Sequence, residues 1–303
     1  MIINPNKKVE KMKKNISKIR KFRDSNEGVV GIVVAVLILG LFVTIITTLQ
    51  TIYVPLWMEQ KEAEHMEDVA NQFSMLKYAI DTQLITEKPI PISTSIKLGS
   101  KEMPFFLSSR SFGNLDILED QFILTVDSDS GTSSYSFGTI KYSSRNSYFL
   151  DQSFIYEGGA VIMDQYKGNV MAISPCFSVE LNPYTYEINL SFNIANISRV
   201  KEKVSVSGYG TYPIKTEFSN SFPPVVFNDV NYINIDTKYP NAWELFFNRT
   251  LTESEDLEYG THFSISENSN GLKIDFFSGA YWDKPNLNIK IYDITAQVGP
   301  GWI

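Results

Sequence analysis

The sequence predicts an α+β protein in which a long N-terminal transmembrane and amphipathic helix precedes a mainly antiparallel, β-sandwich-like exterior domain. An unbroken apolar stretch after Glu27 and an amphipathic pattern behind it predict the helix, and short alternating runs separated by Asn, Gly, Ser, Asp and Pro predict the strands. The expected parts are a basic cytoplasmic leader (1–24), a transmembrane helix (25–57), an amphipathic helix (58–86) and a β-rich exterior domain (87–303).

The leader differs from the rest of the chain in charge. Residues 1–27 hold nine Lys or Arg and three Asp or Glu, a net charge of +6, which leaves −13 for the remainder. Positive residues beside a membrane span stay in the cytoplasm, so the acidic body is expected outside a cell membrane that the chain crosses once. Binding of nucleic acid by the leader is the weaker interpretation, because this segment is short, lacks aromatic interleaving and abuts the span.

The apolar stretch is long enough to cross a bilayer and use membrane lipid as its partner. Gly28 to Ile46 contains no polar side chain except Thr44, and a hydrocarbon core needs roughly 20 apolar residues. No A-x-A-like site follows, which favours an anchor over a secretory signal peptide. Pro55 predicts a kink or break near the membrane interface. The predicted anchor residues are Gly28, Val29, Gly31, Leu37, Leu39, Phe42, Tyr53 and Trp57.

The segment after the span has the period of an amphipathic helix. Its apolar residues recur at steps of three and four: Met66, Val69, Phe73, Leu76, Ile80 and Leu84. Its charged residues are expected on other faces: Glu62, Glu64, Glu67, Asp68 and Lys77. Packing on the β-rich domain and helix-to-helix contact between copies both fit this pattern. Complete burial of Met66, Phe73 and Ile80 against the domain would remove support for helix-to-helix contact between copies.

The remainder is expected to form antiparallel strands, with a possible sub-boundary near residue 175. "NSNG" at 268–271 predicts a hairpin turn. "DSDSGTSS" at 127–134 predicts a polar turn and no EF-hand, because Gly138 stands where that loop requires Glu. The expected strands include "SIKL", "QFILTV", "SYSFGTIKY", "AVIMDQY", "TYEINLSFNI", "KVSVSGYG", "HFSISE", "LKIDFF" and "LNIKIYDITA".

No catalytic, cofactor or metal motif is found in the sequence, so we predict a non-enzymatic protein. Cys176 is the one cysteine and is expected to be a small buried hydrophobe. His65 is expected to be solvated on a charged helix face, and His262 to lie on a strand surface. Three N-glycosylation sequons fall on the exterior side, at Asn189, Asn196 and Asn248. Of these Asn248 is the best candidate, because Asn189 sits inside an expected strand.

The acidic residues before the span have two interpretations. Asp24 can cap the helix, with Glu27 completing a capping-box-like arrangement. Alternatively, a basic leader, polar residues and Glu27 before an unbroken Val/Ile/Leu helix resemble the class III signal peptide of type IV pilins. That resemblance implies cleavage by a prepilin peptidase and pairing of the Glu27 carboxylate with the new amino terminus of a neighbouring subunit. Cleavage between Phe22 and Arg23 would place Glu27 fifth, although no Gly or Ala precedes that bond.

The body also resembles a family. "FGTIKYSSRNSYFLDQSFIYEGGAVIMDQYKGNVM" (137–171) and the closing "GPGWI" (299–303) are similar to archaeal proteins that combine pilin-like N termini with large β-rich exterior domains. The resemblance implies a cell-surface, pilin-like subunit or membrane-anchored component, adhesive in function, with copies of itself or other pilin-like subunits as partners. A permanently anchored exterior receptor or binding module is the alternative, and an anchored hydrolase is a third.

Replacing Glu27 by Gln separates the two interpretations of this residue. For a pilin-like role we expect normal membrane insertion and loss of surface filaments, because the neutral amide cannot pair with a charged amino terminus. If Glu27 only caps the helix, we expect intact assembly and a loss of stability of about 1 kcal/mol or less. Membrane fractionation and electron microscopy of the cell surface measure the two properties.

Overall fold

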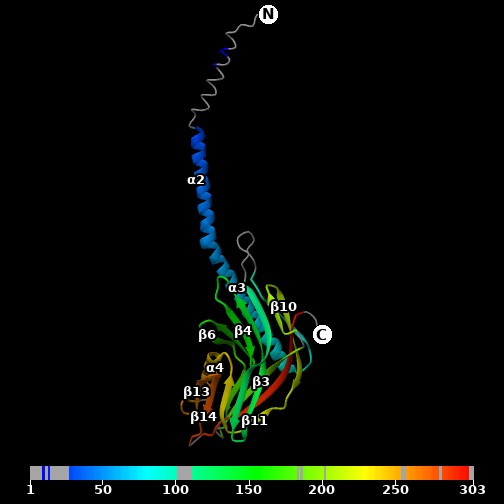
Figure 1. Cartoon of the computed structure of the whole chain (residues 1–303). Helices are drawn as coiled ribbons and strands as arrows, with labels where there is room; N and C mark the ends of the chain where they lie inside the picture. The colour runs from blue at the N-terminus through cyan, green and yellow to red at the C-terminus, as the bar shows by residue number, and fades with distance from the viewer. Residues whose placement is uncertain are drawn as a thin grey trace. The chain divides into compact units, whose positions relative to one another are not determined.

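The computed structural model describes residues 9–10, 13, 27–100, 111–182, 184, 187–200, 203–253, 257–279 and 282–299. It divides into two compact units, Met1–Leu56 and Trp57–Ile303 (Figure 1). Its helices from residue 27 onward are α2 (Glu27–Thr48), the π-helical turn η1 (Leu49–Tyr53), α3 (Val54–Thr86) and α4 (Pro240–Glu253). Its strands are β1 (Ile92–Lys97), β2 (Phe112–Ser128), β3 (Gly131–Arg145), β4 (Gln152–Glu157), β5 (Ala160–Gln165), β6 (Gly168–Ile173), β7 (Cys176–Leu181), β8 (Ile188–Arg199), β9 (Ser205–Gly208), β10 (Thr211–Ser221), β11 (Val225–Phe227), β12 (Val230–Asp236), β13 (Phe263–Asn268), β14 (Gly271–Phe276) and β15 (Asn286–Val298).

We expected a kink or a break at Pro55. Every residue from 27 to 86 is helical, so the helix does not break there. The irregularity lies just before Pro55, where the Val54 N–H donates to the carbonyl of Leu49, five residues back. Pro55 has no N–H to donate, and the wider turn ahead of it adjusts the hydrogen-bond ladder to that loss. Thr44 fits the apolar helix because its hydroxyl donates to the Gly40 carbonyl at 2.8 Å.

The strands form two sheets, and the prediction of a mostly antiparallel β-rich domain is confirmed. The six-stranded sheet has the order β1-β10-β15-β8-β7, with β11 beside β15. The nine-stranded sheet has the order β13-β14-β12-β2-β3-β4-β5-β6, with β9 beside β2. Among the described strand pairs only β8 and β15 are parallel. The chain changes sheet at 174–175, between β6 and β7, and strands from both sides of that point contribute to each sheet.

The two sheets approach each other closely at β3 and β8. A Cβ atom on Gly138 of β3 would lie 1.9 Å from the carbonyl oxygen of Ile197 in β8, so only glycine fits there. The Gly138 N–H also donates to the side chain of Asn196 at 3.2 Å. Whether the two sheets are best described as a sandwich stays a prediction.

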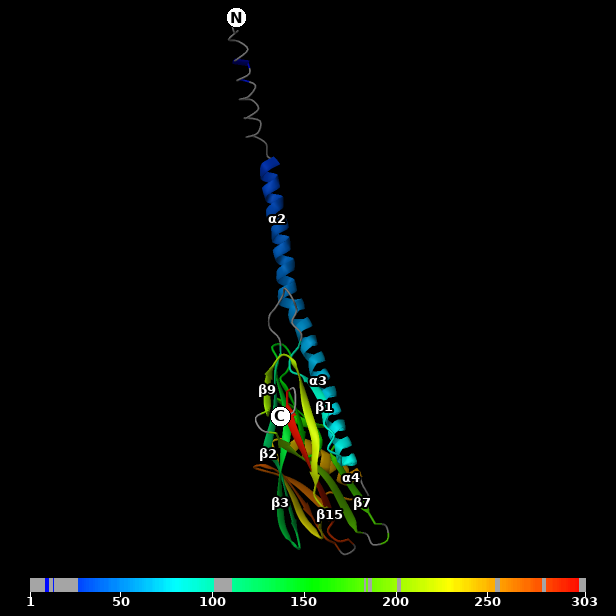
Figure 2. The ribbon, with the colours of Figure 1, turned by 90° about the vertical axis from the view of Figure 1, so that its right-hand side faces the viewer.

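The amphipathic face of α3 packs on the β domain. Its six predicted apolar residues are all buried in a cluster that takes side chains from both sheets, including Leu115, Tyr142, Ile197 and Ile294. Figure 2 shows α3 beside β1, where the Lys97 N–H donates to the Gln72 side chain at 2.8 Å. Met66, Phe73 and Ile80 are at most 3% exposed, so this face has no apolar surface left for a second helix.

Both predicted turns are confirmed. The β13–β14 hairpin pairs Asn268 with Gly271 across a two-residue loop, and β2 and β3 are joined by the polar turn at 129–130. Helix α4 was not predicted from the sequence, although its buried Trp243, Phe247 and Leu251 repeat every four residues after Pro240. That spacing is typical of a helix, and Pro suits its first turn, but the surrounding strand patterns obscured it.

The packing of α3 predicts unequal effects of two neighbouring truncations. Phe73→Ala should lower the free energy of unfolding by about 3–5 kcal/mol, because it leaves a cavity beside Phe154, whose ring centroid lies 5.9 Å away. Met75→Ala, at a side chain that is 64% exposed, should change it by less than about 0.5 kcal/mol. Urea unfolding of the full chain in detergent measures both. Equal effects would contradict the observed orientation of α3.

Candidate functional site

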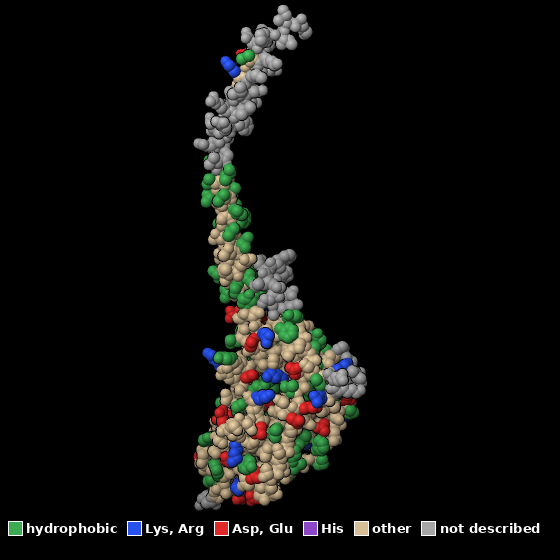
Figure 3. Space-filling model, viewed as in Figure 1, with side chains coloured by type: hydrophobic (Ala, Val, Ile, Leu, Met, Phe, Trp, Pro, Cys, Tyr) green, Lys and Arg blue, Asp and Glu red, His purple; other side chains and the backbone are tan. Residues whose placement is uncertain are grey.

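The first candidate site is the surface of α2. All described side chains from 30 to 48 are exposed, and all but the Gly and Thr residues are apolar, as the green surface in Figure 3 shows. Water solvates such a surface poorly, whereas a helix of this length and composition can span a membrane. Of the predicted anchor residues, Leu37, Leu39, Phe42, Tyr53 and Trp57 are exposed, and Gly31 has open space around it. For Gly28 and Val29 the structure describes only the helical backbone.

The predicted processing residues are not positioned by the structure. Asp24 lies outside the described residues, and Glu27 is described only as the first residue of α2. Their capping and pairing roles therefore stay predictions.

The second feature is a set of buried polar residues that hold α3 on the β domain. Glu62, expected on another face than the apolar stripe, is fully buried. One of its carboxylate oxygens accepts the backbone N–H groups of Tyr148 and Phe149, each at 2.7 Å, and the other accepts that of Ser147 at 3.0 Å. Three hydrogen bonds from one turn satisfy this buried carboxyl group. Lys77, also expected on another face than the apolar stripe, has a buried stem, and its ammonium pairs with Asp81 at 2.7 Å.

The prediction that His65 is solvated is wrong. The side chain is 1% exposed, and its Nε2 lies 3.1 Å from the Tyr142 hydroxyl. That hydroxyl donates to the Leu98 carbonyl at 3.0 Å, so Nε2 carries the proton and donates to Tyr142. Burial, reinforced by nearby Lys97, lowers the pKa of His65 to about 4. His65 is therefore a neutral internal contact.

The third feature is Glu157, which joins the nine-stranded sheet to α4. Its carboxylate is 1% exposed and accepts from the Thr237 hydroxyl at 2.6 Å and the Trp243 indole N–H at 2.9 Å. Burial raises the pKa of Glu157 to about 7, although these two hydrogen bonds favour the charged form. A cavity of about 40 Å³ beside it is lined by Lys141, Lys238 and other side chains. Glu157 was not predicted as a functional residue, because Thr237 and Trp243 lie 80 and 86 residues away in the chain.

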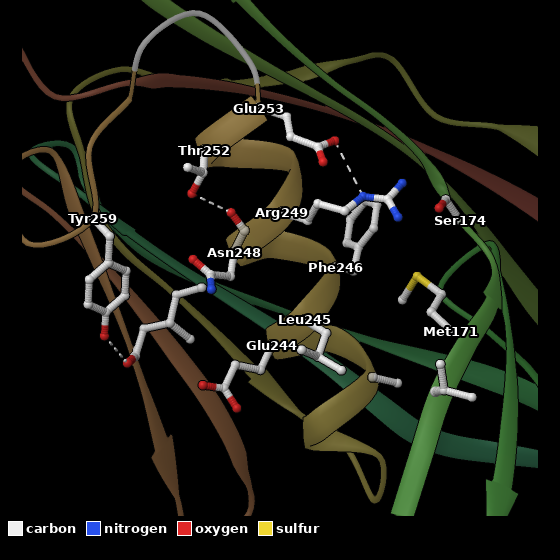
Figure 4. A pocket seen from close by; sticks show the side chains of 13 residues that line it. Met171, Ser174, Glu244, Leu245, Phe246, Asn248, Arg249, Thr252, Glu253 and Tyr259 are labelled. Carbon is white, nitrogen blue, oxygen red and sulfur yellow. Dashed lines mark hydrogen bonds and ion pairs between the residues drawn. The ribbon is translucent and has the colours of Figure 1, made fainter.

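The fourth feature is an open groove along α4, which we call the α4 groove (Figure 4). It has a volume of about 800 Å³, within the range of sites for small ligands. Its apolar walls come from β6, α4, the segment before β13 and β13 itself, and consist of Val170, Met171, Leu245, Phe246, Tyr259 and Ile265. Both edge strands of the nine-stranded sheet, β6 and β13, therefore border the helix.

Polar side chains of α4 also line the α4 groove. Arg249 pairs with Glu253 at 3.4 Å, and Asn248 lines the same surface. The Tyr259 hydroxyl donates to the Ile265 carbonyl at 3.1 Å, which fixes the orientation of an aromatic ring that is 55% exposed. The groove combines exposed apolar area with hydrogen-bonding groups, and its acidic and basic groups nearly balance.

The three predicted glycosylation sites differ sharply in environment. Asn248 is exposed on α4. Asn196 is half-buried in the central strand β8, where its amide donates to Asp293 at 2.9 Å and accepts from Gly138. Asn189 is half-buried and accepts from Asn286 at 3.4 Å.

Two other residues depart from prediction. Cys176, expected to be buried, is exposed at the start of the edge strand β7. His262 lies in the turn before β13, where its Nδ1 accepts the Glu258 N–H at 3.0 Å and its ring lies 4.5 Å from that of Trp282. Among the described residues, no three His, Cys, Asp or Glu side chains are grouped so as to hold a metal ion.

Comparisons with protein-family models, curated proteins and solved structures gave no match for this chain.

Glu157 predicts an unusual dependence of stability on pH. Its folded pKa of about 7 exceeds the ordinary value of 4.5, so between these values the native state holds a proton that the unfolded state has lost. This group therefore lowers stability as pH rises from 4.5 to 7. Glu157→Gln, which still accepts from Thr237 and Trp243, should match wild type near pH 4.5 and exceed it at pH 8 by up to about 3 kcal/mol.

Urea unfolding of the full chain at the two pH values measures this difference. Glu267→Gln is the control, because Glu267 is exposed on β13. A Glu157→Gln variant that is less stable than wild type at pH 8 would contradict the assignment of Glu157 as a carboxyl held near its neutral form.

Proposed function

We propose that this chain is a non-enzymatic, pilin-like surface protein of an archaeal cell. In this proposal α2 is the membrane anchor, the leader is cytoplasmic, and the β domain is displayed outside as part of a surface structure, with adhesion as its role. The observation that carries the proposal is the contrast between two neighbouring helical segments. The apolar side chains of α2 are exposed, whereas those of α3 are buried in the β domain.

This contrast supports a division of labour along the helix. An exposed apolar helix needs lipid or other apolar helices around it, whereas a helix that is buried along one stripe serves as part of a folded core. The pilin-like arrangement uses both, because the same chain must stay in a membrane before assembly and present a soluble domain outside it. In the proposal the sandwich-like domain supplies that presented surface.

Assembly, if it follows the pilin pattern, must use α2. The stripe of α3 from Met66 to Leu84 is occupied by the β domain and is not available to a neighbouring subunit. Other pilin-like subunits and copies of this chain are therefore proposed to meet along α2, where Glu27 begins the helix.

A second candidate, a permanently anchored receptor or binding module, is favoured by a different observation. The α4 groove is an open concave surface of about 800 Å³ with an exposed aromatic ring and polar side chains. Such a surface suits ligand capture by a domain that never leaves the membrane.

The amino terminus of the protein isolated from its own membranes decides between these candidates. For the pilin-like role we expect mass spectrometry to find a mature start between Arg23 and Glu27, because the leader is removed before assembly. Recovery of an intact N-terminal peptide that includes Lys18 to Arg23 would remove the processing hypothesis and leave the anchored receptor.

A further inference from the structure

We propose that the chain carries one N-linked glycan, attached to Asn248, whose first sugars lie in the α4 groove. The proposal rests on the exterior location of the β domain in the proposed function. The tripeptides alone do not determine which of the three asparagines is modified, since "NLS", "NIS" and "NRT" are equivalent as acceptors.

The environments of the three asparagines separate them. The amide of Asn196 bridges Gly138 and Asp293 across three strands, so a sugar on its nitrogen would displace a hydrogen bond in the centre of the domain. Asn189 is half-buried in the same strand, which is flanked on both sides by neighbours. Asn248 has an exposed side chain, and its backbone carbonyl accepts the Thr252 hydroxyl at 2.6 Å.

The reaction requires that α4 be unfolded when the sugar is added. In a helix Asn248 and Thr250 point in different directions, whereas an acceptor tripeptide must present both side chains to one active site. The Asn248 amide nitrogen bonds to the anomeric carbon of a lipid-linked glycosyl phosphate. The bond from that carbon to the phosphate oxygen breaks, the phosphate departs with the electron pair, and the amide nitrogen loses one proton. Folding then accepts the modified chain, because a sugar on Asn248 disturbs no described hydrogen bond of the side chain.

The α4 groove gives the attached sugars a surface to cover. Asn248 is part of the wall of the groove and extends from α4 toward the side where Tyr259 lies (Figure 4). The exposed ring of Tyr259 offers an apolar face to a sugar ring, and Glu244 and Arg249 offer hydrogen-bonding groups to its hydroxyls. Leu245, which is 61% exposed, would lose contact with water beneath the glycan.

Peptide mass spectrometry of the full-length protein from its own membranes tests the proposal. We expect the peptide that contains Asn248 to carry the mass of at least one sugar, and the peptides that contain Asn189 and Asn196 to be unmodified. Asn248→Gln should lose the entire mass shift. Thr250→Ser, which keeps the hydroxyl of the acceptor tripeptide, should retain it. An unmodified Asn248, or a sugar on Asn189 or Asn196, would overturn the proposal.

Hydrogen exchange tests the position of the glycan separately from its attachment. The amides of α4 should exchange more slowly in the wild-type protein than in Asn248→Gln, and Tyr259→Ala should remove that protection without removing the glycan mass. Equal exchange in wild type and Asn248→Gln would overturn the placement in the groove. Protease accessibility of the β domain on intact cells checks the exterior location, so that an exterior domain without a glycan rejects this inference alone.

Discussion

The apolar stripe of α3, from Met66 to Leu84, packs against side chains of both sheets and so joins them in one core. Leu115 and Tyr142 of one sheet and Ile197 and Ile294 of the other would lose this cover without the helix. A buried polar group fixes the position of the stripe, because the Glu62 carboxylate accepts the backbone N–H groups of three residues in the turn at 147–149. The β domain therefore needs part of the N-terminal helix in order to be complete.

This dependence limits what the rest of the helix can do. Since the stripe of α3 is committed to the domain, the exposed apolar surface of α2 is the part that needs an external partner. Lipid satisfies that requirement in a membrane, and neighbouring apolar helices satisfy it in a filament. The two environments demand the same kind of side chain, which is why the surface of α2 alone fits both the pilin-like proposal and the anchored receptor.

At α4 the constraint is different, because this helix lies between the two edge strands of the nine-stranded sheet. Trp243 stacks on Phe122 at 5.1 Å between ring centroids, and its indole N–H reaches Glu157. One face of α4 is thus held in the core, and the opposite face leaves the α4 groove open beside β6 and β13. The same helix therefore contacts the buried Glu157 carboxyl of β4 on one face and borders the exposed α4 groove on the other.

The sequence by itself determined the features that depend on local pattern. The apolar length of α2, the helical period of α3, the alternation of the strands and the turns at 129–130 and 269–270 each depend on residues close together in the chain. Glycosylation sequons and catalytic motifs are likewise local, because each is defined by a few neighbouring residues.

Only the tertiary structure decided the environment of individual polar side chains. Glu62 and His65 stand four residues before Met66 and Val69, on the buried stripe of α3, and each polar group is accommodated there by a partner from a distant segment, the turn at 147–149 or Tyr142. Cys176 is exposed on the edge strand β7, whereas the Asn196 side chain is hydrogen-bonded to Gly138 and Asp293 of two other strands. Burial and hydrogen bonding depend on which distant segments meet, and a pattern within one segment carries no information about its partners.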